Sequence, residues 1–295
     1  MKVSTSLNVF LPDNPIDRAM ERCRDAGFTT LDFNYWDYQK YVHGLTWEEE
    51  EAWAQRIRAL ADSLRLRFTQ MHGPVHGRSF SDMVLQLNEE SFLAMAARSL
   101  QTAAILGIPW VVFHPSAITG SGEPYKELLA YNVRFYERLL PAAERTGVGL
   151  ALENMYDRTQ AQPLTRRRAY CAMPDELIEL IDTLNHPLVG ACWDTGHAHE
   201  QSLDQARIRE LGSRLKATHI NDNDGIRDLH LLPFSGTIQW NAVMEALRDI
   251  RYAGDFTYEA HSSIRVLPDG LRDAGLRYAA ELGNYLVRSA GGEEA

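Results

Sequence analysis

The amino-acid sequence predicts an α/β protein, a single-domain (β/α)8 barrel, or TIM barrel, over residues 1–295. Short apolar runs alternate eight times with longer segments of helical periodicity, a pattern typical of repeated βα units around a parallel sheet. The chain has 295 residues, of which 45% are hydrophobic. It can therefore bury one large core, and its length suits one barrel better than two ordinary domains.

Eight strands and eight helices are expected in alternation. The strands are expected at residues 3–9, 29–34, 67–72, 110–114, 148–153, 189–194, 215–220 and 255–260. The helices are expected near residues 15–26, 47–64, 88–106, 125–146, 174–184, 203–211, 238–250 and 270–288.

Particular residues mark the boundaries of these elements. Thr46 and Glu49 form the pattern of a capping box before the second helix. Three glycines stand where helices should stop, namely Gly27, Gly107 and Gly147. The polar segment 154–173 is expected to form an extended loop after the fifth strand, on the face where such barrels keep their active sites.

Charge and cysteine content limit the classes of partner. The formal net charge of −10 disfavours nucleic acid, because binding to phosphate polyanions draws on basic patches. The first residues alternate apolar and polar side chains and no stretch is apolar enough to cross a bilayer, so we expect a cytoplasmic protein without a membrane segment. The three cysteines, at positions 23, 171 and 192, form no C-x-x-C pattern, so a bound metal would use oxygen and nitrogen ligands.

Metal-ligand residue types stand at the ends of six predicted strands. In chain order they are His72, His114, Glu153, Asp194 with His197 close behind it, His219 and Glu259. The carboxyl ends of parallel barrel strands converge on one mouth, so these residues would become neighbours. Carboxylates with imidazole suit Mn²⁺, Mg²⁺, Co²⁺ or Zn²⁺ and leave coordination positions open for a substrate.

The alternation of side chains along a strand supports this site. If Glu153 points into the barrel, Ala151 does too, while Leu150 and Leu152 face the helices. The same count directs Lys216, the one lysine inside a predicted strand, away from the mouth. A Schiff-base mechanism is therefore disfavoured.

At these strand ends the sequence resembles the xylose isomerase-like barrel superfamily, which holds sugar phosphate isomerases and epimerases, ketose 3-epimerases, inosose-pathway enzymes and endonuclease IV. The motifs that carry the resemblance are Ala-Leu-Glu-Asn-Met (151–155), Trp-Asp-Thr-Gly-His-Ala (193–198), Thr-His-Ile-Asn-Asp (218–222) and Tyr-Glu-Ala-His (258–261). The resemblance implies that one divalent metal is bound by four residues, Glu153, Asp194, His219 and Glu259.

The resemblance also implies a sugar or polyol substrate and a proton-transfer reaction. Glu153 and Glu259 would act as acid and base on a metal-stabilised enediolate. The candidate substrate-binding residues are His197, Arg227, His72 and His114. Relatives of this kind are commonly homodimers or homotetramers.

Other functions remain open at the level of sequence. A dehydratase acting on a keto-polyol could use the same metal site. Five further residues, His72, His114, His197, Asp228 and His230, resemble the additional ligands of endonuclease IV, so up to three zinc ions are chemically available. Against a nuclease, Gly196 replaces a cysteine of that enzyme, and the loop 221–224 is acidic. A noncatalytic sugar-binding or metal-binding barrel is the alternative of a different class.

Two segments near the expected mouth leave their roles open. The aromatic segment Tyr35-Trp36-Asp37-Tyr38 follows the second strand and would either cover the apolar face of a sugar or form a packed lid. The arginines at positions 158 and 166–168 would either reach a phosphate or form a solvated loop face. These arginines do not separate free from phosphorylated sugars.

Overall fold

The computed structural model describes the chain outside residues 11–13, 76–86, 116–124, 162–163, 168 and 291–295. Eight parallel strands form one sheet in the order β10-β1-β2-β3-β4-β5-β8-β9. They are β1 (Val3–Ser6), β2 (Thr30–Asn34), β3 (Arg67–His72), β4 (Trp110–Phe113), β5 (Gly149–Glu153), β8 (Val189–Asp194), β9 (Leu215–His219) and β10 (Phe256–Tyr258).

Two hydrogen bonds join the two edges of this sheet. The Ile220 amide donates to the Thr257 carbonyl at 2.8 Å, and the Glu259 amide donates to the Ile220 carbonyl at 3.0 Å. The strands therefore close into the expected (β/α)8 barrel.

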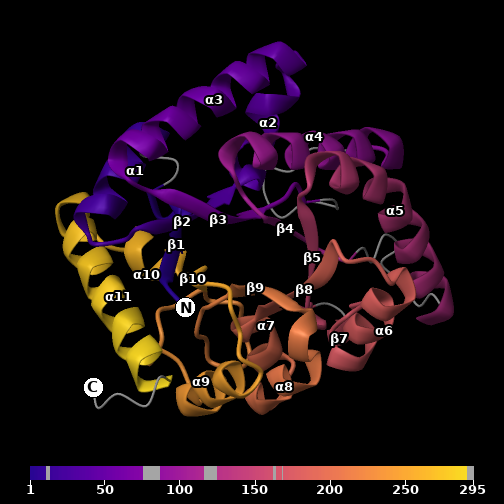
Figure 1. Cartoon of the computed structure of the whole chain (residues 1–295). Helices are drawn as coiled ribbons and strands as arrows, with labels where there is room; N and C mark the ends of the chain where they lie inside the picture. Colours follow the sequence, from indigo (N-terminus) through magenta and orange to yellow (C-terminus); the bar gives the residue numbers. More distant parts are fainter. Residues whose placement is uncertain (11–13, 76–86, 116–124, 162–163, 168, 291–295) are drawn as a thin grey trace.

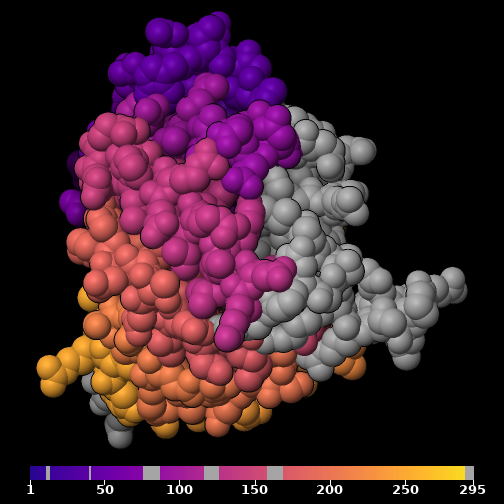
Figure 2. Space-filling view, turned by 90° about the vertical axis from the view of Figure 1, so that its right-hand side faces the viewer, coloured from indigo at the N-terminus to yellow at the C-terminus, as the bar shows by residue number. Residues whose placement is uncertain are grey.

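Helices surround the strands in the order of the chain (Figure 1). The expected helices correspond to α1 (Ile16–Asp25), α3 (Trp47–Leu64), α4 (Glu89–Leu106), α5 (Tyr125–Thr146), α6 (Pro174–Leu184), α8 (Ile208–Leu211), α9 (Trp240–Asp249) and α11 (Asp269–Ala290). Seen from the side, the magenta surface of the α4 and α5 region lies between the indigo N-terminal part and the orange C-terminal half (Figure 2).

The core has two layers, as the alternation of side chains predicts. Leu150 and Leu152 belong to the large cluster between strands and helices. A small cluster fills the barrel interior and consists of Val112, Ala151, Cys192 and Ala217, with Trp110 packed against it. The side chains of the interior and those facing the helices thus form separate packed layers.

The structure also contains elements that the periodicity does not predict. The first strand ends at Ser6, and the 3-10 helix η1 (Leu7–Phe10) follows it. Short helices closely follow other strands, namely α2 (Tyr35–His43), α7 (Thr195–Glu200) and α10 (His261–Arg265). The expected helix 203–211 is divided into η2 (Gln205–Arg207) and α8, before η3 (Gly212–Arg214).

The prediction that residues 154–173 form an extended loop is wrong for part of that segment. Strands β6 (Arg158–Ala161) and β7 (Leu164–Arg167) pair there as an antiparallel hairpin. The side chains of residues 158–168, including the arginines noted above, lie outside the described part of the chain.

The predicted helix boundaries are confirmed where local chemistry set them. Thr46 and Glu49 form both hydrogen bonds of a capping box at the start of α3. Gly107 ends α4 in the left-handed region with φ of 76°, where a side chain would be strained. Over the described residues, no helix combines the length and apolar character needed to cross a membrane.

The N-terminal end of the barrel is filled by two large side chains. The register between β8 and β9 shifts at Ala191 and Cys192. Lys216 lies against Gly190, and its Nζ stands 5.6 Å from the centre of the Trp110 ring. Trp110 and Lys216 both lie at the starts of their strands, β4 and β9. Lys216 therefore lies at the end of the barrel opposite the mouth.

Candidate metal centre

Four buried side chains from four strand ends converge at the mouth of the barrel. Glu153, Asp194 and His219 end β5, β8 and β9, and Glu259 directly follows β10. Their exposed fractions are between 0% and 5%. One ligand atom from each of the four lies within 4.8 Å of all the others. A single cation could therefore contact all four.

His219 lies between two of the carboxylates. Its Nδ1 is 2.6 Å from Glu153 Oε1 and 3.4 Å from Glu259 Oε2. Burial lowers the pKa of His219, but Cys192, Glu259 and Glu153 together raise it well above its ordinary value. Burial raises the pKa of Glu153, but the neighbouring His219 and His114 hold it well below its ordinary value.

The donor set fits a divalent cation. Three buried carboxylates share the site with an imidazole. Burial is the largest cause that raises the pKa of one of them, Asp194, to about 6. Burying several carboxylates without cations is costly in free energy, so these groups need positive charge beside them. Oxygen with imidazole nitrogen is the ligand chemistry of Mn²⁺, Zn²⁺, Co²⁺ and Mg²⁺ sites.

Two asparagines that we did not predict as site residues hold Asp194 in place. Asn221 Nδ2 donates to Oδ1 and Oδ2 of Asp194 at 3.1 and 3.0 Å. The Asp194 amide donates to Asn154 Oδ1 at 2.6 Å, and Asn154 Nδ2 donates back to the Asp194 carbonyl at 3.0 Å. A signal existed in the sequence, since each asparagine follows a predicted ligand by one or two positions.

Gly196 makes this arrangement sterically feasible. A Cβ at position 196 would collide with the side-chain amide of Asn221. The residue before His197 must therefore be glycine if Asn221 is to reach Asp194. Carboxylates that ligate metals are commonly oriented by hydrogen bonds of this kind.

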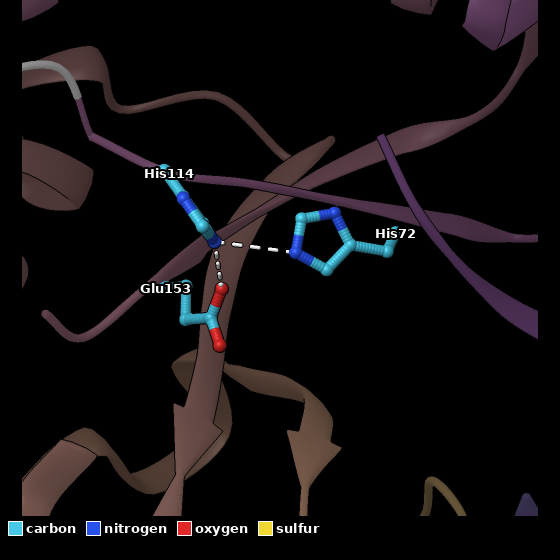
Figure 3. A group of neighbouring side chains, drawn as sticks. All are labelled: His72, His114 and Glu153. Carbon is cyan, nitrogen blue, oxygen red and sulfur yellow. Dashed lines mark hydrogen bonds and ion pairs between the residues drawn. The ribbon is translucent and has the colours of Figure 1, made fainter. Parts of the chain in front are cut away.

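A second group of potential ligands shares Glu153 with the first. His114 Nε2 lies 2.9 Å from Glu153 Oε2 and 3.2 Å from His72 Nε2 (Figure 3). The His72 ring stacks on the His219 ring with 5.4 Å between centres. Burial and the neighbouring His114 lower the pKa of His72 to about 4, so its imidazole is neutral near pH 7 and can act as a ligand or a hydrogen-bond partner.

The remaining candidates form a third group beside Asp194 and Glu259. His230 Nε2 is 3.1 Å from Asp228 Oδ2, and His197 Nε2 is 3.9 Å from the same oxygen. Burial lowers the pKa of both histidines, but nearby carboxylates, chiefly Asp228 for His230 and Asp194 for His197, raise them to about 10 and about 9. The structure therefore brings together every predicted strand-end residue.

Arg227 is the predicted site residue that the structure does not bring to this cluster. Its side chain is 70% exposed and forms an ion pair with Asp224 at 2.8 Å. The Arg227 amide donates to the same aspartate at 2.9 Å, which fixes the turn. This local partner directs the guanidinium to solvent, so the role of Arg227 in binding substrate stays a prediction.

The family model of xylose isomerase-like TIM barrels matches residues 20–291 of this chain. The chain belongs to this family. A solved structure of L-ribulose 3-epimerase has a TM-score of 0.75 and 18% identity, and the match covers 99% of this chain and 96% of that chain. The IOLI protein, solved with a bound zinc atom, has a TM-score of 0.73 and 18% identity over 98% and 99% of the two chains. At this identity the two structures show the fold alone.

One curated relative of this xylose isomerase-like barrel has a different described activity. A probable endonuclease 4 of Oleidesulfovibrio alaskensis is 32% identical over 179 residues, which are 55% of this chain and 58% of that protein. The matched segment thus spans less than two thirds of the relative. Sugar epimerases and a nuclease both resemble this chain.

Proposed function

We propose that this protein is a divalent-metal-dependent sugar isomerase or epimerase that moves a proton next to a carbonyl group. The observation that supports the proposal most is the convergence of Glu153, Asp194, His219 and Glu259, whose ligand atoms lie within 4.8 Å of one another. A divalent ion bound there would polarise a substrate carbonyl and stabilise the enediolate formed on loss of the adjacent proton.

Glu153 and Glu259 are the proposed acid and base. They come from β5 and β10, which are separated in the barrel by β8 and β9, so their carboxylates approach the site from two sides. One would remove the proton and the other would return it. Return to the opposite face of the same carbon gives epimerisation, and transfer to the neighbouring carbon gives isomerisation.

Isotope exchange tests this proposal. The metal-loaded protein is incubated in deuterated water with D-psicose, D-tagatose, L-ribulose, an inosose and D-fructose 6-phosphate, and deuterium next to the carbonyl is measured. We expect exchange with at least one compound, and its loss by roughly 10³-fold or more in Glu153→Gln and Glu259→Gln. The exposed Glu245→Gln on α9 is the matched control.

Loss of the metal must be separated from loss of an acid or base. Asp194→Asn removes a ligand that has no proposed role in proton transfer. Excess metal should restore exchange in Asp194→Asn but not in the two glutamate variants. If the glutamate variants recover equally, Glu153 and Glu259 are ligands only, and if wild type exchanges no compound, the proposed function is wrong. Loss of water from an inosose after exchange would identify the dehydratase.

A second candidate function is a zinc-dependent phosphodiesterase. It is favoured by the group His72, His114 and Glu153, whose ligand atoms also lie within 4.8 Å of one another, and by the Asp228–His230 pair beside Glu259. This function predicts up to three zinc ions per chain and cleavage of abasic DNA that weakens steeply with salt. One ion per chain and no cleavage would exclude it.

A further inference from the structure

On the β1–β2 side of the mouth, several buried polar atoms have no hydrogen-bond partner among the residues that the structure describes. Among them are Asn8 Oδ1 on η1, and Trp36 Nε1 and Asp37 Oδ2 on α2. Buried polar groups are nearly always hydrogen-bonded to protein, water or ligand. These three atoms on η1 and α2 therefore call for a partner.

Ring and amide contacts place these side chains beside the ligand cluster. The Trp36 ring is 5.8 Å from the His72 ring, which stacks on His219. Asn8 Nδ2 is 3.4 Å from Nδ1 of His261, whose ring is 4.4 Å from that of His230. Both contacts connect the β1–β2 side of the mouth to the metal side.

Asp37 lies within the electrostatic reach of the same cluster. Burial, the largest cause, raises the pKa of Asp37 to about 7, with Arg265 lowering and Glu259 raising it. A carboxyl group with this pKa both accepts and donates hydrogen bonds near neutral pH. Arg265 itself donates from Nε to the Asn8 carbonyl at 2.6 Å, which joins α10 to η1.

The position of α2 is fixed by an ion pair with one buried partner. Glu50, which is 0% exposed, accepts from the Tyr35 hydroxyl at 2.8 Å and forms an ion pair with Arg98. Arg98 also donates to the carbonyls of Val42 and Leu45 at the other end of α2. The hydrogen bonds of Glu50 and Arg98 hold both ends of the helix that carries Trp36 and Asp37.

We propose that Asn8, Trp36 and Asp37 form a second wall of the substrate site, which binds hydroxyl groups of the sugar remote from its metal-binding oxygens. An indole N–H donor, an amide oxygen acceptor and a carboxyl group match vicinal hydroxyls, each of which donates and accepts. The inference rests on the proposed function and adds a determinant of substrate choice: the wall selects polyols over their deoxy analogues.

Binding measurements test the wall independently of turnover. Calorimetry on the metal-loaded protein gives the Kd of the ketose that wild type exchanges fastest, and the Kd of its analogues lacking one remote hydroxyl. We expect Asp37→Ala to weaken binding of the full ketose roughly 10- to 100-fold, with Asp37→Asn affected less. Trp36→Phe, which keeps the ring and loses the N–H, should weaken binding roughly 3- to 10-fold. Asp62→Ala, an exposed aspartate on α3, is the control.

The deoxy analogues distinguish contact from packing. Wild type should prefer the full ketose to one analogue, and Asp37→Ala should bind both equally, while metal affinity stays unchanged. The wall does not contact substrate if the variants bind like wild type, or if they bind the full ketose and all its analogues more weakly by the same factor. The proposed function would stand in either case. If wild type shows neither exchange nor binding with any compound, both proposals fail together.

Discussion

The two ends of the barrel interior use the same strands for different purposes. At the N-terminal end of β5, Gly149 lies against the Trp110 ring, which fills the interior. Ala151 forms the next layer, and Glu153 ends the strand at the mouth. The three inward positions thus hold a glycine that leaves room for Trp110, an alanine that packs in the interior, and a glutamate that could bind a metal. The residues that pack the interior and the residue that could bind a metal thus lie in different layers along the same strand.

Glycine substitutions at the two ends should affect different properties, metal binding at the mouth and stability at the N-terminal end. Gly196→Ala at the mouth would push Asn221 away from Asp194. Because loss of such an orienting hydrogen bond commonly costs metal affinity, we expect binding to weaken roughly 10- to 100-fold. Metal titration followed by calorimetry measures this, and unchanged affinity would mean that Asn221 does not orient the ligand.

At the N-terminal end, Gly149→Ala should destabilise the fold and leave the metal site intact. The added Cβ would collide with the Trp110 ring, and overpacking of this kind costs roughly 1–3 kcal/mol. Urea unfolding measures the change, with Gly44→Ala as a control because its Cβ would make only an ordinary 3.5 Å contact. A loss of metal affinity in Gly149→Ala would show that the two ends are coupled.

The metal-free protein should also show a pH-dependent stability. The pKa of His230 is raised to about 10 by Asp228, which outweighs the effect of burial, and the ordinary histidine value is about 6.5. The stabilisation is therefore complete below about pH 6.5 and is lost as the pH rises towards 10. Unfolding free energies at about pH 7, 8.5 and 10 should fall less steeply in His230→Gln than in wild type or the exposed control His43→Gln. Parallel slopes would contradict this account.

The contrast between the two ends also explains what sequence could predict. The alternation of Leu150, Ala151, Leu152 and Glu153 fixes which side chains face inward, and parallel strands bring their ends together. For that reason the fold and the convergence of the six strand ends were predictable.

Other features depend on contacts that periodicity does not encode. The start of α2 depends on the Tyr35–Glu50 hydrogen bond between two separate helices, so the helix was not predicted. The place of Lys216 depends on a register shift between β8 and β9. Arg227 is turned outward by Asp224 three residues before it, a pattern that is visible in the sequence once it is looked for.

Anomalous diffraction from crystals grown with Mn²⁺ tests the metal site most directly. The account predicts a strong peak surrounded by the side chains of Glu153, Asp194, His219 and Glu259, and its disappearance in His219→Ala. A chain that binds no ion at any loading, or a peak that these four side chains do not contact, would contradict it.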